Sequence, residues 1–171
     1  MKNITKKEFL EKGYIFLDVN GPEYSEFQIS LYLDYFKKEV NIRIKGIDKK
    51  EAADKIAVAY EAVKNLLNSN IEITENIKKE IYQDYRDTVE NAVMGIVNYE
   101  GFNSELEANE AHFKISSPKE AFERLKFNSI FTDLELAKKD VFNFYYDSPW
   151  YEYNCIDVQI QNGKSVYMET W

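Results

Sequence analysis

The sequence has few of the residues that form disulfide bonds, bind metal ions or act as catalytic nucleophiles. Its 171 residues include one cysteine, Cys155, and one histidine, His112. A lone cysteine excludes an internal disulfide, and any catalytic triad, Cys-His pair or multi-histidine metal site would depend on that single histidine. We interpret Cys155 as a packed thiol in a strand and His112 as an ordinary surface or packing residue. The chain also has no glycine-rich phosphate loop, Gly-x-Ser-x-Gly or Cys-x-x-Cys motif, so we predict no enzyme activity, no cofactor and no metal.

Long apolar runs are also missing. No stretch approaches the roughly 18 uncharged apolar residues that a membrane helix needs. The lysine-rich start, residues 1–7, does not resemble a secretory signal peptide. We therefore expect a cytoplasmic protein without a membrane partner, in a compartment where an unpaired cysteine stays reduced.

Structure-breaking residues are few, with 3 prolines and 6 glycines, while 44% of residues are hydrophobic. Such a chain is too apolar to be disordered, and its length suits one domain over residues 1–171. The formal net charge is −8. That sign disfavours nucleic acid, whose binders need lysine and arginine, and it favours basic partners or simply solubility.

Alternation of apolar and polar residues predicts an antiparallel hairpin over residues 27–35 and 40–45. Ahead of it, Thr5 and Glu8 have capping-box spacing, which predicts a short helix over 6–12. A strand is expected to follow over 14–19.

Helical spacing then takes over. Asp48 is expected to cap a helix that continues to Leu67, and a second helix runs from Thr74 to Val89. Because the connection is short, we expect the two helices to lie side by side on one face of a sheet. From residue 95 to 111 the periodicity is lost and the segment reads as a loop. Ser117 and Pro118 then begin a short helix over 118–125.

The remaining chain alternates as strands over residues 127–132 and 142–146. The last pair, 156–160 and 166–168, is joined through an Asn-Gly turn. The sequence therefore predicts an α+β fold with one, mainly antiparallel sheet, built from an N-terminal hairpin and a C-terminal meander. The two longer central helices should pack on one face, with short helices near 6–12 and 118–125.

Aromatic and acidic residues gather between two predicted strands, over residues 145–153, with no basic residue among them. Tyrosine and tryptophan dominate interface hot spots, so this segment would suit a basic protein surface or the face of a sugar ring. The alternative is that its rings fold back and form a lid on the core. A second acidic segment, residues 100–110, would either steer a basic partner electrostatically or simply be a solvated loop.

The order of parts also carries a resemblance over residues 25–171. An N-terminal hairpin leads into an alanine-rich helix (52–57) and a second helix with Ile77 and Ile81, and the chain closes on a strand–Asn-Gly-Lys–strand unit (156–168). This arrangement resembles small bacterial immunity proteins encoded near polymorphic or contact-dependent toxins. The acidic stretch 98–111 and the tyrosine-rich loop depart from it.

The resemblance implies a stoichiometric inhibitor that binds a cognate, basic toxin in the cytoplasm and occludes it. The residues that we predict to bind this partner are Asp147, Trp150, Tyr151, Glu152 and Tyr153, with Glu105, Glu107 and Glu110 as a secondary steering edge. A small-molecule or carbohydrate-binding module is the main alternative. An enzyme that uses two carboxylates is a third, because glycosidases need only two placed acids.

Overall fold

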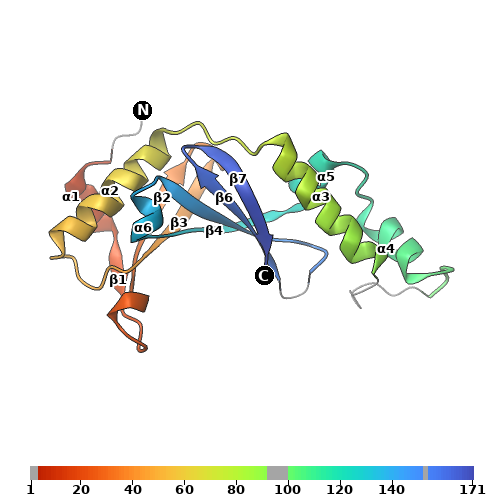
Figure 1. Cartoon of the computed structure of the whole chain (residues 1–171), viewed down its shortest axis with the longest axis horizontal. Helices are drawn as coiled ribbons and strands as arrows, with labels where there is room; N and C mark the ends of the chain where they lie inside the picture. Colours follow the sequence, from red (N-terminus) through yellow and green to blue (C-terminus); the bar gives the residue numbers. More distant parts are fainter. Residues whose placement is uncertain (1–3, 92–99, 152–153) are drawn as a thin grey trace.

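The computed structural model describes residues 4–91, 100–151 and 154–171. Its centre is one seven-stranded sheet whose spatial order follows the chain from β1 to β7 (Figure 1). The strands are β1 (Tyr14–Phe16), β2 (Glu26–Leu33), β3 (Lys38–Lys45), β4 (Lys126–Asp133), β5 (Val141–Asp147), β6 (Cys155–Gln161) and β7 (Lys164–Thr170). Every neighbouring pair is antiparallel except β3 and β4, which are parallel. The predicted α+β class and the single, mostly antiparallel sheet are confirmed.

Helices make the crossover that the parallel pair requires. The helical elements are α1 (Lys6–Lys12), the 3-10 turn η1 (Pro22–Tyr24), α2 (Ala53–Asn68), α3 (Glu75–Glu90), α4 (Glu105–Phe113), α5 (Pro118–Arg124) and α6 (Leu134–Ala137). Helices α2 to α5 lie between β3 and β4 in the chain. In Figure 1, α1, α2 and α6 lie at one end of the sheet and α3, α4 and α5 at the other. Within the described ranges, no helix combines the length and apolar character needed to cross a membrane.

Several local signals for caps and turns are confirmed. Thr5 and Glu8 form the reciprocal capping box of α1, and the Ser117 side chain caps α5. Asn162 and Gly163 both have positive φ, 50° and 84°, which is the backbone of the tight turn that joins two strands in a hairpin. These features were predictable because each depends on residues three or fewer positions apart.

Alternate strand residues form one continuous core with the helices. Phe27, Ile42 and Phe144 are among the fully buried side chains of the sheet, and Ile56 and Ile81 are among those of α2 and α3. Because side chains alternate across a strand, the residues between them face the other side of the sheet. That second face carries the candidate site described below.

The two long helices do not lie side by side, contrary to the prediction. The connection over residues 69–74 runs extended instead of turning back, and an extended segment of that length spans up to about 20 Å. It is held against the β6–β7 turn, since the Glu72 amide donates to the Gly163 carbonyl at 2.8 Å and Ser165 N donates to the Glu72 carbonyl at 3.0 Å. Helix α2 therefore ends near one end of the sheet, and α3 begins toward the other (Figure 1).

Part of the predicted acidic loop is the helix α4. The Ser104 hydroxyl caps it by accepting a hydrogen bond from the Glu107 amide at 3.1 Å. Its periodicity is weak in the sequence because the helix buries a polar residue, Asn109, which has no exposed surface, beside Ala108 and Phe113. A helix with a polar residue on its buried face cannot be recognised from the spacing of hydrophobic residues alone.

Two predicted boundaries also move. Helix α2 begins at Ala53 without a side-chain cap, and Asp48 instead pairs with Lys55, with 3.5 Å between Oδ1 and Nζ. Strand β1 stops at Phe16 and does not continue to Val19. Element ends depend on small local energies, which the tertiary contacts of this chain override.

Gly13 gives a testable packing constraint on the α1–β1 junction. A Cβ atom added at Gly13 would overlap the buried Phe27 ring, with its Cε1 only 2.6 Å away, although the backbone itself is unstrained (φ −82°). We expect Gly13→Ala to lower the free energy of unfolding by about 1–3 kcal/mol, as overpacked cores do. Urea denaturation measures this. The control Lys12→Ala changes an exposed neighbour and is expected to stay within about 0.5 kcal/mol, so equal effects of the two variants would contradict the packing argument.

Candidate functional site

The described part of the aromatic segment, residues 145–151, is divided between core and surface. Trp150 has 0% exposed surface. Its indole Nε1 donates a hydrogen bond to Asp84 Oδ2 at 3.1 Å, and its ring packs edge-to-face on Tyr85, with centroids 5.3 Å apart. A side chain with no exposed surface has none to offer a partner, so Trp150 is removed from the predicted partner-binding residues.

Tyr151 belongs to the same buried network. Its hydroxyl donates to Asp84 Oδ1 at 2.9 Å and accepts from the Thr88 hydroxyl at 3.0 Å. Thr170 also donates to Asp84 Oδ1, at 3.0 Å. One carboxylate on α3 thus fastens the β5–β6 connection and strand β7 to the helix. For Trp150 and Tyr151, the core-lid interpretation describes the structure.

The other predicted members of this segment have different surroundings. Asp147 is exposed at the end of β5 and accepts a hydrogen bond from Asn128 Nδ2 at 3.0 Å. It remains available to a partner. Glu152 and Tyr153 lie outside the described residues.

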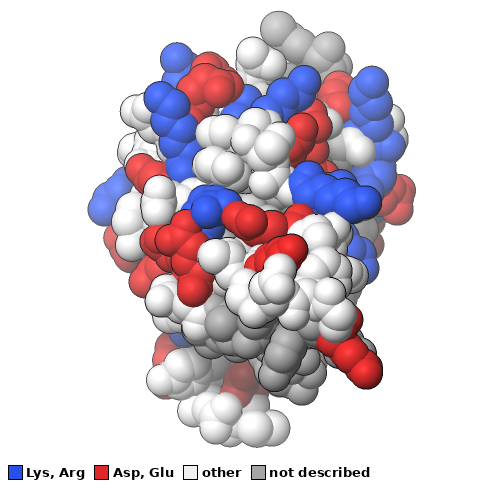
Figure 2. Space-filling model, turned by 90° about the vertical axis from the view of Figure 1, so that its right-hand side faces the viewer, with Lys and Arg blue, Asp and Glu red and all other residues white. Residues whose placement is uncertain are grey.

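The predicted steering edge is largely engaged within the protein. Glu105 is the first residue of α4. Glu107 Oε2 accepts from the Asn103 amide at 2.9 Å, and Glu110 pairs with Arg86, with 2.7 Å between Oε1 and Nη1. Figure 2 shows the end of the molecule that bears α3–α5, where lysine and arginine side chains are interspersed with acidic ones. This end is therefore not a uniformly acidic surface.

A different acidic and aromatic surface is formed by the side of β5–β7 that faces away from the core. Its members alternate along each strand with the buried residues Phe144, Val158 and their neighbours. It consists of Asn143, Tyr145 and Asp147 from β5, Cys155, Asp157 and Gln159 from β6, and Tyr167, Glu169 and Trp171 from the end of the chain. We call this set the nine-residue face.

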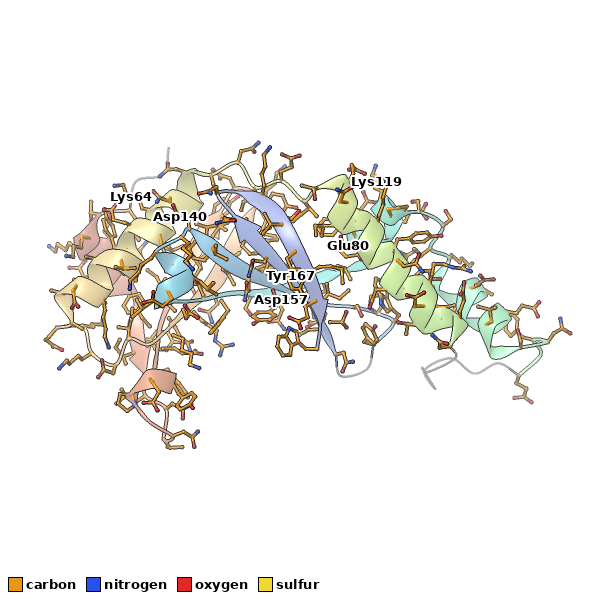
Figure 3. All side chains as sticks on the ribbon, in the orientation of Figure 1. Lys64, Glu80, Lys119, Asp140, Asp157 and Tyr167 are labelled. Atoms are coloured by element: carbon orange, nitrogen blue, oxygen red, sulfur yellow. The ribbon has the colours of Figure 1, made fainter. Side chains whose placement is uncertain are left out.

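Strand register arranges the face in three rows. Tyr145, Asp157 and Glu169 are directly opposite one another and form the middle row. Asp147, Cys155 and Trp171 form one flanking row, in which the backbones of Cys155 and Trp171 exchange hydrogen bonds of 3.1 and 3.0 Å. The third row is Asn143, Gln159 and Tyr167. Asp157 is therefore the centre, and Figure 3 labels it together with Tyr167 on the neighbouring strand.

The electrostatics of the face are one-sided, because it contains three carboxylates and no lysine or arginine. Two basic residues lie on the adjoining strands: Lys126 on β4 is directly opposite Asp147, and Arg43 on β3 binds the Glu26 carboxylate through Nε and Nη2 at 2.9 and 2.8 Å. The guanidinium also lies over the Phe131 ring, 5.8 Å from its centroid. The negative charges of the face thus have no basic counterpart within the set.

Asp157 is in an unusual environment for a carboxylate. It is only 7% exposed, and its Oδ1 is buried without a hydrogen-bond partner among the described residues. Burial, and then the negative charge of Glu169, raise the pKa of Asp157 to about 7, while an interaction with Trp171 acts in the opposite direction. Buried polar groups in proteins are nearly always hydrogen-bonded, so this oxygen calls for an explanation.

Cys155 lies in a strand as predicted but is only partly buried, and His112 is at the surface. Burial, followed by the charges of Asp157 and Asp147, raises the pKa of the Cys155 thiol. A raised pKa disfavours the thiolate that nucleophilic chemistry uses. His112 is exposed on α4, with its ring edge-to-face on Phe113.

The nine-residue face was missed at the sequence level because its members come from three strands. The predicted contacts are consecutive residues within 145–153, whereas a strand presents only every second residue to one side. A signal was present in β6, where Cys155, Asp157 and Gln159 alternate with three buried aliphatic residues. An acid in the middle of a strand indicates that the second side of the sheet is polar, but not which residues lie opposite it.

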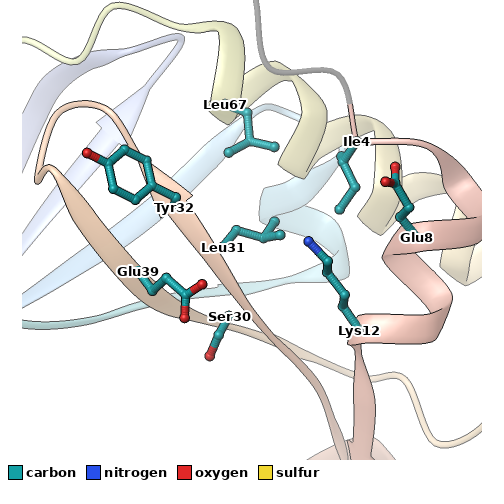
Figure 4. Close-up of a pocket in the computed structure, with 8 residues that line it drawn as sticks. All are labelled: Ile4, Glu8, Lys12, Ser30, Leu31, Tyr32, Glu39 and Leu67. Carbon is teal, nitrogen blue, oxygen red and sulfur yellow. The ribbon is translucent and has the colours of Figure 1, made fainter.

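A pocket of about 260 Å³ lies elsewhere, between α1 and the edge of β2. Figure 4 shows its polar lining, which includes Glu8, Lys12 and Glu39, around the apolar Leu31. Glu8 is already used by the capping box of α1, with the Thr5 amide 2.8 Å away. The volume is slightly below the range of about 300–1,000 Å³ usual for ligand pockets, so this pocket is a weaker candidate than the face.

Comparison with known proteins places the chain in a family. No curated protein and no solved structure matches it. A family model described as a domain of unknown function (DUF6985) matches residues 19–171, which include β2 to β7 and the whole nine-residue face. Because the match covers most of the chain, the protein belongs to the DUF6985 family of domains of unknown function.

Proposed function

We propose that the protein is a cytoplasmic immunity protein that binds a cognate basic toxin through the nine-residue face and neutralises it by one-to-one occlusion. The observation that carries the proposal is the composition of that face: three carboxylates and three aromatic rings with no basic residue. Acidic surfaces attract basic proteins and raise their association rate. The overall charge of −8 has the same sign.

Aromatic side chains give the face its contact area. Tyr167 is 52% exposed and Trp171 is 62% exposed, and they lie four residues apart at the edge of the sheet. Tyrosine and tryptophan lose little conformational entropy on binding and are the commonest hot-spot residues. The face therefore combines anchors for affinity with charges for specificity. The choice of a toxin as the partner rests on the resemblance to immunity proteins described above.

The test is binding to the toxin encoded beside the gene of this protein. The tagged protein is co-expressed with that toxin, the complex is isolated, and its Kd is measured by calorimetry. We expect a one-to-one complex whose Kd rises at least a hundredfold in the double variant Tyr167→Ala/Trp171→Ala, because two hot-spot rings contribute about 2 kcal/mol or more each.

A matched control is available at the opposite edge of the sheet. Tyr14 and Phe16 on β1 are exposed to a similar degree, so Tyr14→Ala/Phe16→Ala removes equivalent rings from the far edge. This control is expected to leave the Kd unchanged. Equal Kd values for the two double variants, or no complex with a toxic neighbour, would contradict the proposal.

The exposed pair Tyr167 and Trp171 also favours the alternative of a carbohydrate-binding module, since sugar rings stack on aromatic faces. A ligand that binds only the folded state raises its melting temperature. A thermal screen against oligosaccharides distinguishes the two functions. The carbohydrate-binding function would replace the immunity proposal if two results are found together. An oligosaccharide stabilises the wild type but not Tyr167→Ala/Trp171→Ala, and no complex with a toxin is isolated.

A further inference from the structure

We propose that Asp157 and Glu169 together receive one arginine side chain of the partner at the centre of the nine-residue face. This inference rests on the proposed function and names the chemistry that its site would recognise. It is carried by the geometry of the middle row, in which the two acids lie directly opposite each other on β6 and β7.

The first argument is the unsatisfied oxygen. Asp157 is more than nine-tenths buried, and its Oδ1 has no hydrogen-bond partner among the described residues. The side chain is directed to the outer side of the sheet, since Ile156 and Val158 on either side of it are buried in the core. A donor that arrives with a partner would satisfy this atom.

The second argument is the charge around it. The titratable groups that face Asp157 are Tyr145 and Asp147 on β5, Cys155 on β6 and Glu169 on β7. All are acidic or neutral. Of the nearby cations on β3 and β4, Arg43 is held by Glu26, and Lys126 lies opposite Asp147 and not opposite Asp157. Two close carboxylates without a cation repel each other. A guanidinium placed between them would remove that repulsion.

The third argument is the shape of the surroundings. Tyr145, Tyr167 and Trp171 surround the two acids in the three rows of the face. A guanidinium is planar, binds carboxylates in a two-pronged manner and stacks on aromatic rings, whereas an ammonium group does not. Glu169 and Trp171 are exposed beside Asp157, and the Trp171 side chain hydrogen-bonds to it, so an incoming guanidinium takes the place of this indole donor. The combination of acids and rings fits arginine better than lysine.

Binding of an arginine side chain should change the apparent pKa of Asp157, which can be measured directly. With its raised pKa, Asp157 carries a proton part of the time near neutral pH. A guanidinium prefers the ionised carboxylate, so its binding expels that proton to solvent. The apparent pKa of Asp157 must therefore fall as the site fills.

The experiment uses the full chain and L-argininamide as the probe. Carboxyl-detected NMR follows the pKa of Asp157 with and without about 100 mM probe, which nearly saturates a site with a Kd near 10 mM. By mass action we expect a fall of about one pKa unit. Glu169→Gln is expected to reduce this fall several-fold, while Glu39→Gln, an exposed acid on β3, leaves it unchanged. Lysinamide at the same concentration is expected to produce a smaller fall.

An unchanged Asp157 pKa in argininamide would overturn the inference, and so would an equal fall in the Glu169→Gln protein. Because this readout does not involve the toxin, its failure is distinguishable from failure of the proposed function. Toxin binding that is lost in Tyr167→Ala/Trp171→Ala but unaffected by Asp157→Asn would likewise reject the arginine site alone. A complete amide spectrum of each variant shows that it is folded.

Discussion

Replacing Trp150 by alanine is expected to lower the free energy of unfolding by about 3–5 kcal/mol, the usual cost of removing a large ring from a core. The ring is fully buried against Tyr85, and its indole donates to Asp84. The substitution leaves a cavity and takes one donor away from a carboxylate that also accepts from Tyr151 and Thr170. The β5–β6 connection would lose its main attachment to α3.

Urea denaturation of the two single tryptophan variants provides the comparison. Trp171 is the other tryptophan and is mostly exposed. Trp171→Ala leaves no cavity but removes a hydrogen bond to Asp157, so it is expected to lower the free energy of unfolding by about 1 kcal/mol, well below the cost of Trp150→Ala. For toxin binding we expect the opposite order: Trp171→Ala should raise the Kd more than Trp150→Ala, because Trp171 lies in the nine-residue face and Trp150 does not. A Trp150→Ala protein as stable as the wild type would show that the loop is not packed as described.

Stability should depend on pH through Asp157. Burial and Glu169 raise its pKa to about 7, whereas an unfolded aspartate has its ordinary pKa of 3.8. Between these two values the folded state binds more protons than the unfolded state, so the free energy of unfolding falls as pH rises. The loss of stability caused by ionising the buried Asp157 is absent below about pH 4, grows between pH 4 and pH 7, and is fully present above about pH 7. At 1.36 kcal/mol per pKa unit its upper limit is about 4 kcal/mol.

The variant Asp157→Asn isolates this contribution from the other titrating groups. It keeps the shape of the side chain but cannot ionise. We expect the free energy of unfolding of the wild type, minus that of the variant, to decrease steadily from about pH 4 to pH 7 and then level off. Relative to the wild type, the variant is therefore more stable at pH 8 than at pH 4. Chemical denaturation at a series of pH values measures the difference. A difference that does not vary with pH would mean that Asp157 titrates normally.

Much of the fold was predictable from the sequence, because many of its elements are specified locally. The Thr5–Glu8 box and the Ser117 cap each act over three residues, and the Asn162-Gly163 turn acts over two. Alternation along residues 27–45 and 156–168 gave the hairpins and their buried sides. Helix α4 was missed because its buried face contains Asn109, and the separation of α2 from α3 depends on the contact of Glu72 with the distant β6–β7 turn.

The candidate site was less predictable than the fold. Of the residues proposed as partner contacts, Asp147 is part of the nine-residue face, Trp150 and Tyr151 pack against α3, and Glu110 is paired with Arg86. The sequence showed that aromatic and acidic residues gather near the end of β5. It did not show which of them turn inward, because that depends on an acceptor, Asp84, more than sixty residues away.

The sequence by itself determined the α+β class, the hairpins, the starts of α1, α3 and α5 and the acidic charge, since these follow from periodicity, capping and composition. Only the tertiary structure decided that β3 and β4 pair in parallel, which places the N-terminal hairpin and the C-terminal meander in one sheet. It also decided that Tyr145, Asp157 and Glu169 share a row and that one oxygen there has no hydrogen-bond partner among the described residues. The physical reason is that strand register and burial arise from contacts between segments far apart in the chain, which no local pattern encodes.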